Sequence, residues 1–283
     1  MPDLEISPLS NALGAEVSGL DLSKPLDAAT FRQVHRAHLE YLVLVFRDQA
    51  ITPRQQIEFS KRLGPLDQHP ADDAVLPDHP EILVVSTKKE DGAFVGLPDG
   101  GPMWHSDLAY RERTSLGSML YGIEIPEEGG DTRFANMYSA YDALPQYLKK
   151  AVTGRRGVFL AGRSNEKQVF LRNLNQTQKE RTPAVTHPLI RTHPETGLKS
   201  IFANPQHTIS IEGMDPLEAN DILAELFAYG TKEDFIYRHK WRVGDLTFWD
   251  NRCVWHIADL SRISDPTYVR HLHRTTITGD VPV

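Results

Sequence analysis

Apolar residues in this chain occur mainly in short runs bounded by glycine, proline or charged residues. Residues 42–46 and 81–86 are β-branched or apolar runs between such breakers, which is typical of buried strands. Residues 184–204 predict two strands joined by the turn Pro194-Glu195-Thr196-Gly197. The C-terminal third is predicted to be β-rich as well, with strands in residues 235–241, 246–249 and 268–278.

Helices are predicted where capping residues precede an apolar stripe. The tetrad Thr52-Pro53-Arg54-Gln55 is a capping box with proline at the first helical position, and Gly64-Pro65 supplies the stop. Asp215-Pro216 begins another helix, which should end at Gly230. Shorter helices are expected in residues 31–41, 139–143 and 145–152.

These elements alternate without a regular βαβ rhythm, which argues against a Rossmann or TIM architecture. A mainly β protein with added helices, built on a jelly-roll-like barrel, fits the pattern better. All-β barrels of 283 residues are often one domain, so we expect a single domain over residues 1–283. Residues 88–101 carry five glycines and prolines and predict a mobile loop, not a domain boundary.

Charge and composition exclude several partners. The formal net charge of -7 argues against nucleic acid or an anionic membrane as the main partner, because both favour a basic surface. The N-terminus lacks a basic segment followed by an apolar one, and the longest aliphatic-aromatic run, residues 41–46, is far too short to span a bilayer. The one cysteine, Cys253, cannot form an internal disulfide, so we expect a cytoplasmic protein.

The sharpest chemical signal is Trp104-His105-Ser106-Asp107. On extended backbone, residues two apart project to the same face, so His105 and Asp107 could share one ion. His256 follows an apolar strand and a polar turn and supplies a third ligand. Two imidazoles and one carboxylate leave three open positions on an octahedral ion, which suits Fe(II) oxygenases.

The His-x-Asp pair is a weak signal by itself, because it recurs by chance and a histidine beside tryptophan is commonly a packed core residue. The chain has 12 histidines. Surface or packing roles are expected for His35, His38, His79, His187, His193 and His239.

Two arginines on the last predicted strand offer anion-binding groups. Alternation puts Arg270, Leu272, Arg274 and Thr276 on one face, although it leaves equally open that His271 and His273 point inward instead. A guanidinium pairs bidentately with carboxylate, so an inward Arg270 would suit the distal carboxylate of 2-oxoglutarate.

Two further segments bear on this site. The glycine turn Gly129-Gly130-Asp131-Thr132 can bring the Thr132 hydroxyl into it, although by itself it is an ordinary turn. Arg111 and Arg113 are expected to be solvated loop charges.

In order along the chain, these motifs resemble the TauD/TfdA family, which includes taurine dioxygenase and 2,4-dichlorophenoxyacetate dioxygenase. The resemblance rests on His105-Ser106-Asp107, the Gly129-Gly130-Asp131-Thr132 turn, Trp249-Asp250-Asn251-Arg252 with His256, and Arg270 with Arg274. It extends from Gly14-Ala15-Glu16-Val17 to Arg274-Thr275-Thr276-Ile277, so it covers nearly the whole chain.

The resemblance implies a distorted double-stranded β-helix and an Fe(II)- and 2-oxoglutarate-dependent dioxygenase that consumes O₂ and releases succinate and CO₂. It assigns His105, Asp107 and His256 to the iron, and Arg270 and Thr132 to 2-oxoglutarate. Arg274 and His69 match substrate-binding positions, which implies a small anionic substrate such as a carboxylate, sulfonate or sulfate ester. The other expected substrate contacts are Leu108, Tyr110 and His207. A homo-oligomer is expected by the same resemblance.

The match with taurine dioxygenase is incomplete in the pocket. Gly101 stands at a position that resembles an asparagine site, and His207 stands where an aromatic ring would pack. The run of residues 235–246 is closer to the phenoxyacetate enzymes. Taurine itself is therefore a doubtful substrate.

Two other classes of function remain open from the residues alone. A cupin-like metal-dependent hydrolase or isomerase could use the same three ligands with a metal-bound water, but it would leave Arg270 unexplained. A non-catalytic β-sandwich that binds an acidic ligand would need no metal.

Overall fold

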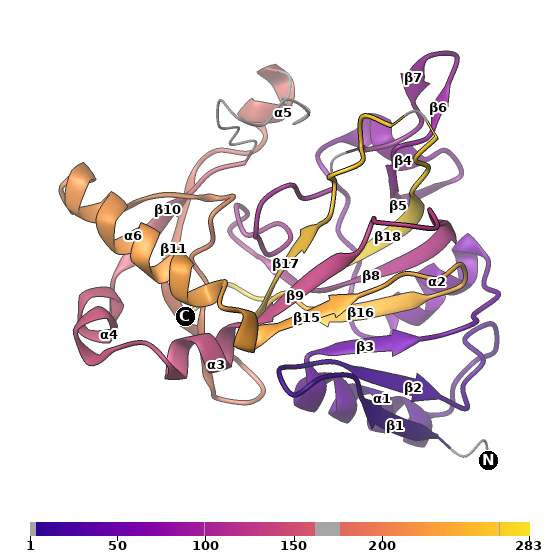
Figure 1. The fold of residues 1–283 in the computed structure, drawn as a ribbon, viewed down its shortest axis with the longest axis horizontal. Helices are drawn as coiled ribbons and strands as arrows, with labels where there is room; N and C mark the ends of the chain where they lie inside the picture. The colour runs from indigo at the N-terminus through magenta and orange to yellow at the C-terminus, as the bar shows by residue number, and fades with distance from the viewer. Residues whose placement is uncertain (1–3, 99, 162–175, 266) are drawn as a thin grey trace.

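The computed structural model describes residues 4–98, 100–161, 176–265 and 267–283 (Figure 1). Over these residues the protein is a mixed but strand-rich structure with several sheets. None of the helices in the described ranges has the length and apolar character needed to cross a membrane.

An eight-stranded sheet forms the centre of the molecule (Figure 1). Neighbouring strands pair antiparallel except β2 and β3, which are parallel. In spatial order the strands are β1 (Glu5–Pro8), β2 (Ala15–Ser18), β3 (Val43–Phe46), β16 (Leu246–Asp250), β8 (Ser115–Glu124), β18 (His271–Thr278), β5 (His79–Ser86) and β4 (Val75–Leu76).

Smaller sheets surround it. The one that matters for the site has the order β15 (Ile236–His239), β9 (Thr132–Asn136) and β17 (Val254–Ala258). A second three-stranded sheet has the order β11 (Val185–Pro188), β10 (Arg156–Phe159) and β14 (Thr208–Ile211). Two hairpins pair β12 (Ile190–Thr192) with β13 (Lys199–Ile201), and β6 (Lys89–Glu90) with β7 (Ala93–Phe94).

Helices α1 (Ala28–Tyr41) and α2 (Pro53–Lys61) cover one face of the large sheet. Asp27 caps α1, and the predicted capping box of Thr52 and Gln55 begins α2. Such a cap stabilises the helix by about 1 kcal/mol. Behind these helices a core forms from side chains such as Val34, Phe59 and Phe248.

The contacts of α2 decide which way β18 faces. Gln56 of α2 donates to the carbonyl of His273, and Ser60 hydrogen-bonds the hydroxyl of Thr275 at 2.7 Å. Because successive strand residues alternate between faces, Arg274 projects to the opposite face, toward the β15-β9-β17 sheet. Side chains of both sheets, including Leu272, form the core between them.

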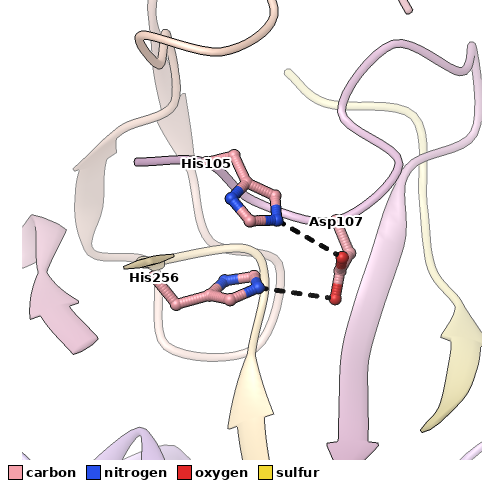
Figure 2. A group of neighbouring side chains, drawn as sticks. All are labelled: His105, Asp107 and His256. Carbon is pink, nitrogen blue, oxygen red and sulfur yellow. Dashed lines mark ion pairs between the residues drawn. The ribbon is translucent and has the colours of Figure 1, made fainter. Parts of the chain in front are cut away.

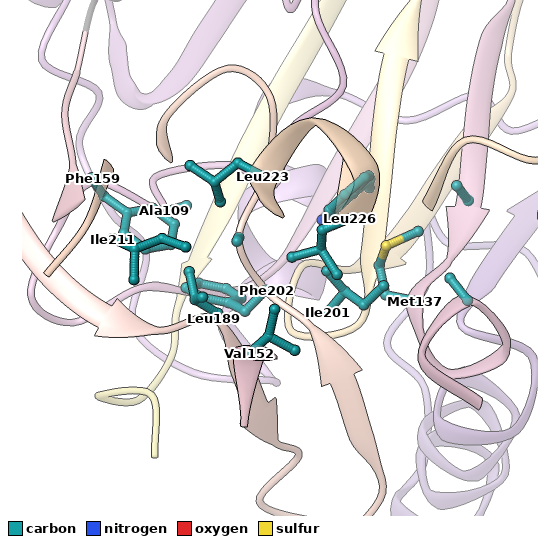
Figure 3. Packing of buried hydrophobic residues seen from close by; sticks show 14 of the residues in the cluster. Ala109, Met137, Val152, Phe159, Leu189, Ile201, Phe202, Ile211, Leu223 and Leu226 are labelled. Carbon is teal, nitrogen blue, oxygen red and sulfur yellow. The ribbon is translucent and has the colours of Figure 1, made fainter. Parts of the chain in front are cut away.

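A third core lies beside these sheets (Figure 3). It packs α3 (Met137–Asp142), α4 (Gln146–Val152) and α6 (Pro216–Gly230) against the β11-β10-β14 sheet. Trp255 of β17 belongs to this core, so β17 is held from its outer side. The remaining short helices are η1 (Asp72–Ala74), α5 (Gln176–Glu180) and η2 (Glu233–Phe235).

Most predicted helices and strands are present, and the predicted end of α6 at Gly230 is confirmed. The predicted loop in residues 88–101 contains the short β6–β7 hairpin, and Leu97 pairs with Val85 of β5; its mobility stays a prediction. Sequence patterns also missed the central strand β8, and they missed β9 and β17, which flank the site.

Candidate metal centre

His105 and His256 are held side by side by their backbones. The two residues form an isolated antiparallel bridge, in which the His105 N–H donates to the His256 carbonyl and the His256 N–H donates back at 2.8 Å. His256 follows strand β16 and the turn of residues 251–253, as expected, and itself lies within β17. Trp255 of β17 packs into the third core, which fixes the strand that carries His256. The bridge then fixes the backbone of His105 beside it.

The expected extended backbone through Asp107 is wrong. Asp107 begins a turn, and the next residue, Leu108, has a φ of 53°. A left-handed conformation is unusual for leucine, and such strain persists only where surrounding contacts enforce it. The turn still directs the Asp107 carboxylate toward both histidines.

Figure 2 shows the three side chains converging. His105 Nε2 lies 3.7 Å from Asp107 Oδ1, and His256 Nε2 lies 3.8 Å from Asp107 Oδ2. Both separations are too long for hydrogen bonds. All three residues are buried, and their ligand atoms lie within 4.8 Å of one another.

Hydrogen bonding determines which nitrogen of His105 is free. Nδ1 lies 2.8 Å from the carbonyl oxygen of Met103, and since a carbonyl only accepts, Nδ1 carries the proton. In the neutral ring Nε2 is then the unprotonated nitrogen, and it faces Asp107. This is the tautomer of a metal-binding histidine whose other nitrogen donates to the backbone.

The electrostatics keep the cluster in its metal-binding protonation state. Burial lowers the pKa of His256 well below its usual value, and the neighbouring His105 lowers it further. Burial works to raise the pKa of Asp107, but the Arg274 guanidinium and the two histidines together hold it well below its usual value. His256 is thus a neutral imidazole and Asp107 a carboxylate.

These residues fit a divalent metal ion. Two imidazole nitrogens and one carboxylate face each other across a gap with no hydrogen bond between them. Ligand atoms bonded at about 2.1 Å and at right angles lie about 3 Å apart, so shifts of under about 1 Å would bring them onto one ion. A facial set of two histidines and one carboxylate is typical of non-haem Fe(II) sites.

Gly101 fits against His105. A Cβ at this glycine would lie 2.1 Å from Cε1 of His105, and its φ of +111° is one that other residues rarely adopt. The asparagine-like position noted in the sequence therefore has no room for a side chain with His105 in this place.

Arg274 contacts the cluster directly. Its Nη1 lies 2.7 Å from Asp107 Oδ1, and the side chain is 6% exposed. Its Nε is buried and has no hydrogen-bond partner among the described residues. Arg274 thus holds one carboxylate oxygen and retains donor capacity for a further anion.

Arg270 and Thr132 lie together, as the sequence anticipated. Arg270 Nε donates to the Gly130 carbonyl at 2.9 Å, and its Nη2 donates to the Thr132 hydroxyl at 3.3 Å. Burial lowers the pKa of Arg270 to about 10. Within the described ranges no carboxylate forms an ion pair with it, although Asp131 and Asp259 act on it from farther away, so a guanidinium that is 3% exposed lacks a direct counter-ion, which is costly unless an anion binds.

One cavity links these groups between the two sheets. The large sheet contributes residues such as Leu120 and Trp249, and the small sheet contributes Thr132 and His256. Its full lining is Val85, Gly100, Leu120, Thr132, Trp249, His256, Ala258, Arg270 and Arg274.

Three of the expected substrate contacts adjoin the cluster on another side. Leu108 and Tyr110 are buried, and the Tyr110 ring lies 4.9 Å from that of His207, centroid to centroid. The His207 ring is in turn 6.1 Å from that of His105. Burial lowers the pKa of His207 to about 3, so it is a neutral ring.

His69 lies in a different segment. Its Nδ1 accepts from the backbone N–H of Ala71. Arg111 connects this segment with the metal motif, since it donates to Asp67 at 3.0 Å and to the Gln68 carbonyl at 2.7 Å. Arg111 is thus an ion-paired link and not the solvated charge expected from the sequence.

Sequence patterns missed three residues that support the site. Trp241 Nε1 donates to the Thr132 hydroxyl at 3.0 Å, and Asn251 and Ser118 hydrogen-bond to Asp107. Of these three residues, Asn251 belongs to the motif Trp249-Asp250-Asn251-Arg252, which could have indicated its role. Ser118 lies on β8, a strand with no clear pattern.

Comparisons with known proteins agree with this geometry. Residues 5–276 match the family described as taurine catabolism dioxygenase TauD, TfdA family. The α-ketoglutarate-dependent 2,4-dichlorophenoxyacetate dioxygenase of Cupriavidus pinatubonensis is 35% identical, over 98% of this chain and 98% of its own length. The (S)-phenoxypropionate/α-ketoglutarate-dioxygenase of Sphingobium herbicidovorans is 34% identical, over 99% of this chain and 96% of its own.

A solved structure extends the comparison to the fold. The crystal structure of AAD-2 in complex with Mn(II) and N-oxalylglycine has a TM-score of 0.81 and 30% identity, and the match covers 99% of this chain and 98% of that one. The fold described above is therefore shared along almost the full length of both chains.

Proposed function

This chain belongs to the TauD/TfdA family and is an α-ketoglutarate-dependent dioxygenase, and from this premise we propose that it oxygenates a small organic acid with an apolar body. α-Ketoglutarate is 2-oxoglutarate, which would be converted to succinate and CO₂. The proposal extends to the metal, which would be Fe(II) held by His105, Asp107 and His256.

The observation that carries the proposal is the buried guanidinium of Arg270. It is completely buried without a carboxylate partner among the described residues, and it shares the cavity with His256 of the metal cluster. Arg270 and Thr132 would bind the distal carboxylate of 2-oxoglutarate, which supplies the missing negative charge. A metal-dependent hydrolase would leave the Arg270 guanidinium without a role, whereas a 2-oxoglutarate-dependent oxygenase gives it one.

Bound iron would supply the activation of O₂ and the oxidative decarboxylation of 2-oxoglutarate. The protein's residues provide the rest. The two histidines and the Asp107 carboxylate would hold the ion, and Arg270 would orient the co-substrate. The buried surroundings exclude bulk water from the reacting groups.

The substrate class follows from the other arginine and the walls beside it. Arg274 retains an unpaired, buried Nε and would bind the acid group of the substrate. On another side of the metal cluster, the buried Leu108, Tyr110 and His207 would present apolar and aromatic surface, which favours an aryl or alkyl body over an aminoalkyl one. Of the anionic classes, a phenoxyalkanoate-like carboxylate fits these walls best, and its hydroxylation next to the ether oxygen would cleave the ether. His69 would assist Arg274.

We extend the proposal to the architecture. The large sheet and the β15-β9-β17 sheet would be the two halves of a distorted double-stranded β-helix, within a single domain of residues 1–283. A cytoplasmic homo-oligomer remains a prediction from the resemblance.

Anaerobic addition of Fe(II) and 2-oxoglutarate tests the reaction class. We expect a visible metal-to-ligand charge-transfer band that His105→Ala abolishes. Intact protein without a band would contradict the oxygenase and return the metal hydrolase and the non-catalytic acid-binding protein to consideration.

Substrate-dependent succinate formation then tests the substrate class. Phenoxyacetate, an alkyl sulfate ester and taurine are compared, and the phenoxyacetate is expected to give the highest turnover. Arg274→Ala should raise the substrate KM or abolish turnover while the charge-transfer band persists. Arg113→Ala is the control, since this exposed arginine follows the same motif but contacts only the Gly279 carbonyl in the described structure. Equal losses in both variants would contradict a substrate role for Arg274.

A further inference from the structure

A chain of buried hydrogen bonds lies behind Asp107. Ser118 Oγ is 2.6 Å from Asp107 Oδ2, and Asn251 Nδ2 is 3.0 Å from Ser118 Oγ. Asn251 also reaches the backbone of the same ligand, since its Oδ1 is 3.1 Å from the Asp107 N–H. Ser118 is 0% exposed and Asn251 is 1% exposed.

The orientation of the Asn251 amide is unambiguous. Its Oδ1 accepts from two N–H groups, the backbone of Asp107 and the indole of Trp249 at 2.9 Å, and only an oxygen can accept both. The amide nitrogen must then donate its two hydrogens to Ser115 and Ser118, each at 3.0 Å. All four hydrogen-bonding positions of this side chain are used.

This orientation determines the direction of the next bond. The Ser118 oxygen accepts from Asn251, so its own hydrogen points to Asp107 Oδ2, which as a carboxylate can only accept. Arg274 occupies Oδ1 at 2.7 Å. Both carboxylate oxygens are thus held by donors, and the torsion of the Asp107 side chain is set from outside the metal cluster.

Asp107 needs such support because it lies in a turn and not in a sheet ladder. Asn251 lies in the connection between β16 and β17, five residues before His256 of β17. One amide therefore links the backbone and side chain of one ligand to the segment that carries another.

We propose that Asn251 and Ser118 are positioning residues that set the Asp107 carboxylate for metal binding. The inference rests on the proposed metal site. Outer-shell partners of metal ligands typically contribute 10–100-fold to metal affinity.

Two serines give a matched test. Ser115 and Ser118 are both buried on β8 and both accept from Asn251 Nδ2, but only Ser118 reaches Asp107. The full-length protein is titrated with Mn(II) alone, and free Mn(II) is measured by electron paramagnetic resonance. We expect Ser118→Ala to raise the Mn(II) Kd about 10-fold and Ser115→Ala less than about twofold, with similar losses of melting temperature in the metal-free proteins.

A general packing role would weaken Mn(II) binding equally in both variants, and that result would overturn the inference. Unchanged Mn(II) affinity in Ser118→Ala would overturn it as well. If the wild-type protein bound no Mn(II), that result would contradict the proposed metal site, and the inference about Asn251 and Ser118 would be overturned with it.

Discussion

Two buried carboxylates among the described residues each lie beside two histidines, but the two groups differ in their hydrogen bonds. Asp107 lies between His105 and His256, whereas Asp250 lies 3.1 Å from His193 and 3.4 Å from His38. The pKa of each carboxyl is held well below its usual value, against the effect of burial, chiefly by a neighbouring arginine. His193, Asp250 and Cys253 even lie close enough together to resemble a metal site.

The difference is the position of the histidine protons. His193 Nδ1 accepts the backbone N–H groups of Glu195 and Thr196, so its Nε2 must carry the proton that it donates to Asp250. His105 has the reverse arrangement, and its bare Nε2 faces Asp107. Backbone hydrogen bonds thus direct the proton of His193 toward its carboxylate and the Nδ1 proton of His105 away from its own.

The arginines complete the contrast. Arg252 donates to both oxygens of Asp250, at 2.8 and 2.7 Å, and the pair is saturated. In the open cluster Arg274 holds only one oxygen of Asp107. We therefore call the Asp250 group the closed cluster and the Asp107 group the open cluster; the first should act in stability and the second in binding.

Asp250→Ala should have the largest effect. It leaves Arg252, which is 3% exposed, as a buried charge with one half-exposed partner, Glu195. Breaking a buried pair in this way costs about 3–5 kcal/mol, which urea unfolding of the metal-free protein would measure. Glu195→Ala is the control and should cost under about 1 kcal/mol. A loss below about 1 kcal/mol for Asp250→Ala would mean that the closed cluster is not structural.

His105→Ala tests the open cluster. Removal of a ligand should weaken Mn(II) binding by more than about 100-fold, because even outer-shell partners contribute 10–100-fold. His193→Ala removes the corresponding histidine of the closed cluster and should leave the Mn(II) Kd within about threefold. Loss of Mn(II) binding in His193→Ala alone would reverse the assignment of the two clusters.

Acid should destabilise the protein partly through the closed cluster. Burial lowers the pKa of His38, so below pH 6.5 the unfolded chain binds a proton more readily than the folded one. The contribution of His38 to the free energy of unfolding is therefore fully present above pH 6.5 and decreases as the pH falls. His38→Gln should reduce this slope by up to about 1.4 kcal/mol per pH unit, as measured by unfolding of the metal-free protein between pH 6.5 and 5. An unchanged slope would show that His38 keeps its proton affinity on folding.

The smallest effect is expected at the co-substrate end of the open cluster. Trp241→Phe removes the indole N–H that holds the Thr132 hydroxyl, a contribution of about 1 kcal/mol. The 2-oxoglutarate Kd, from anaerobic titration of the charge-transfer band, should rise about fivefold. The Mn(II) Kd should not change; a parallel rise in both constants would indicate general disruption.

The sequence predicts a helix start correctly where the capping residues are neighbours in the chain. The capping box at Thr52 and the Asp215-Pro216 start of α6 depend on neighbouring residues only, and both helices begin as predicted. Strand β8 was missed because its segment mixes serine and glycine with apolar residues and is buried on both faces, so it has no alternation to detect.

The sequence by itself determined the chemistry available: two histidines, one aspartate, and two arginines four residues apart, of which Arg274 lies on β18 and Arg270 directly precedes that strand. It could not decide which face of that strand is buried, because alternation defines two sets of residues and treats them alike. The contacts of α2 with His273 and Thr275 decided it, and they turned Arg274 toward the cavity. In the same way, only the three-dimensional structure separates the open from the closed cluster, since it alone shows that Arg252 holds both oxygens of Asp250 whereas Arg274 holds one oxygen of Asp107.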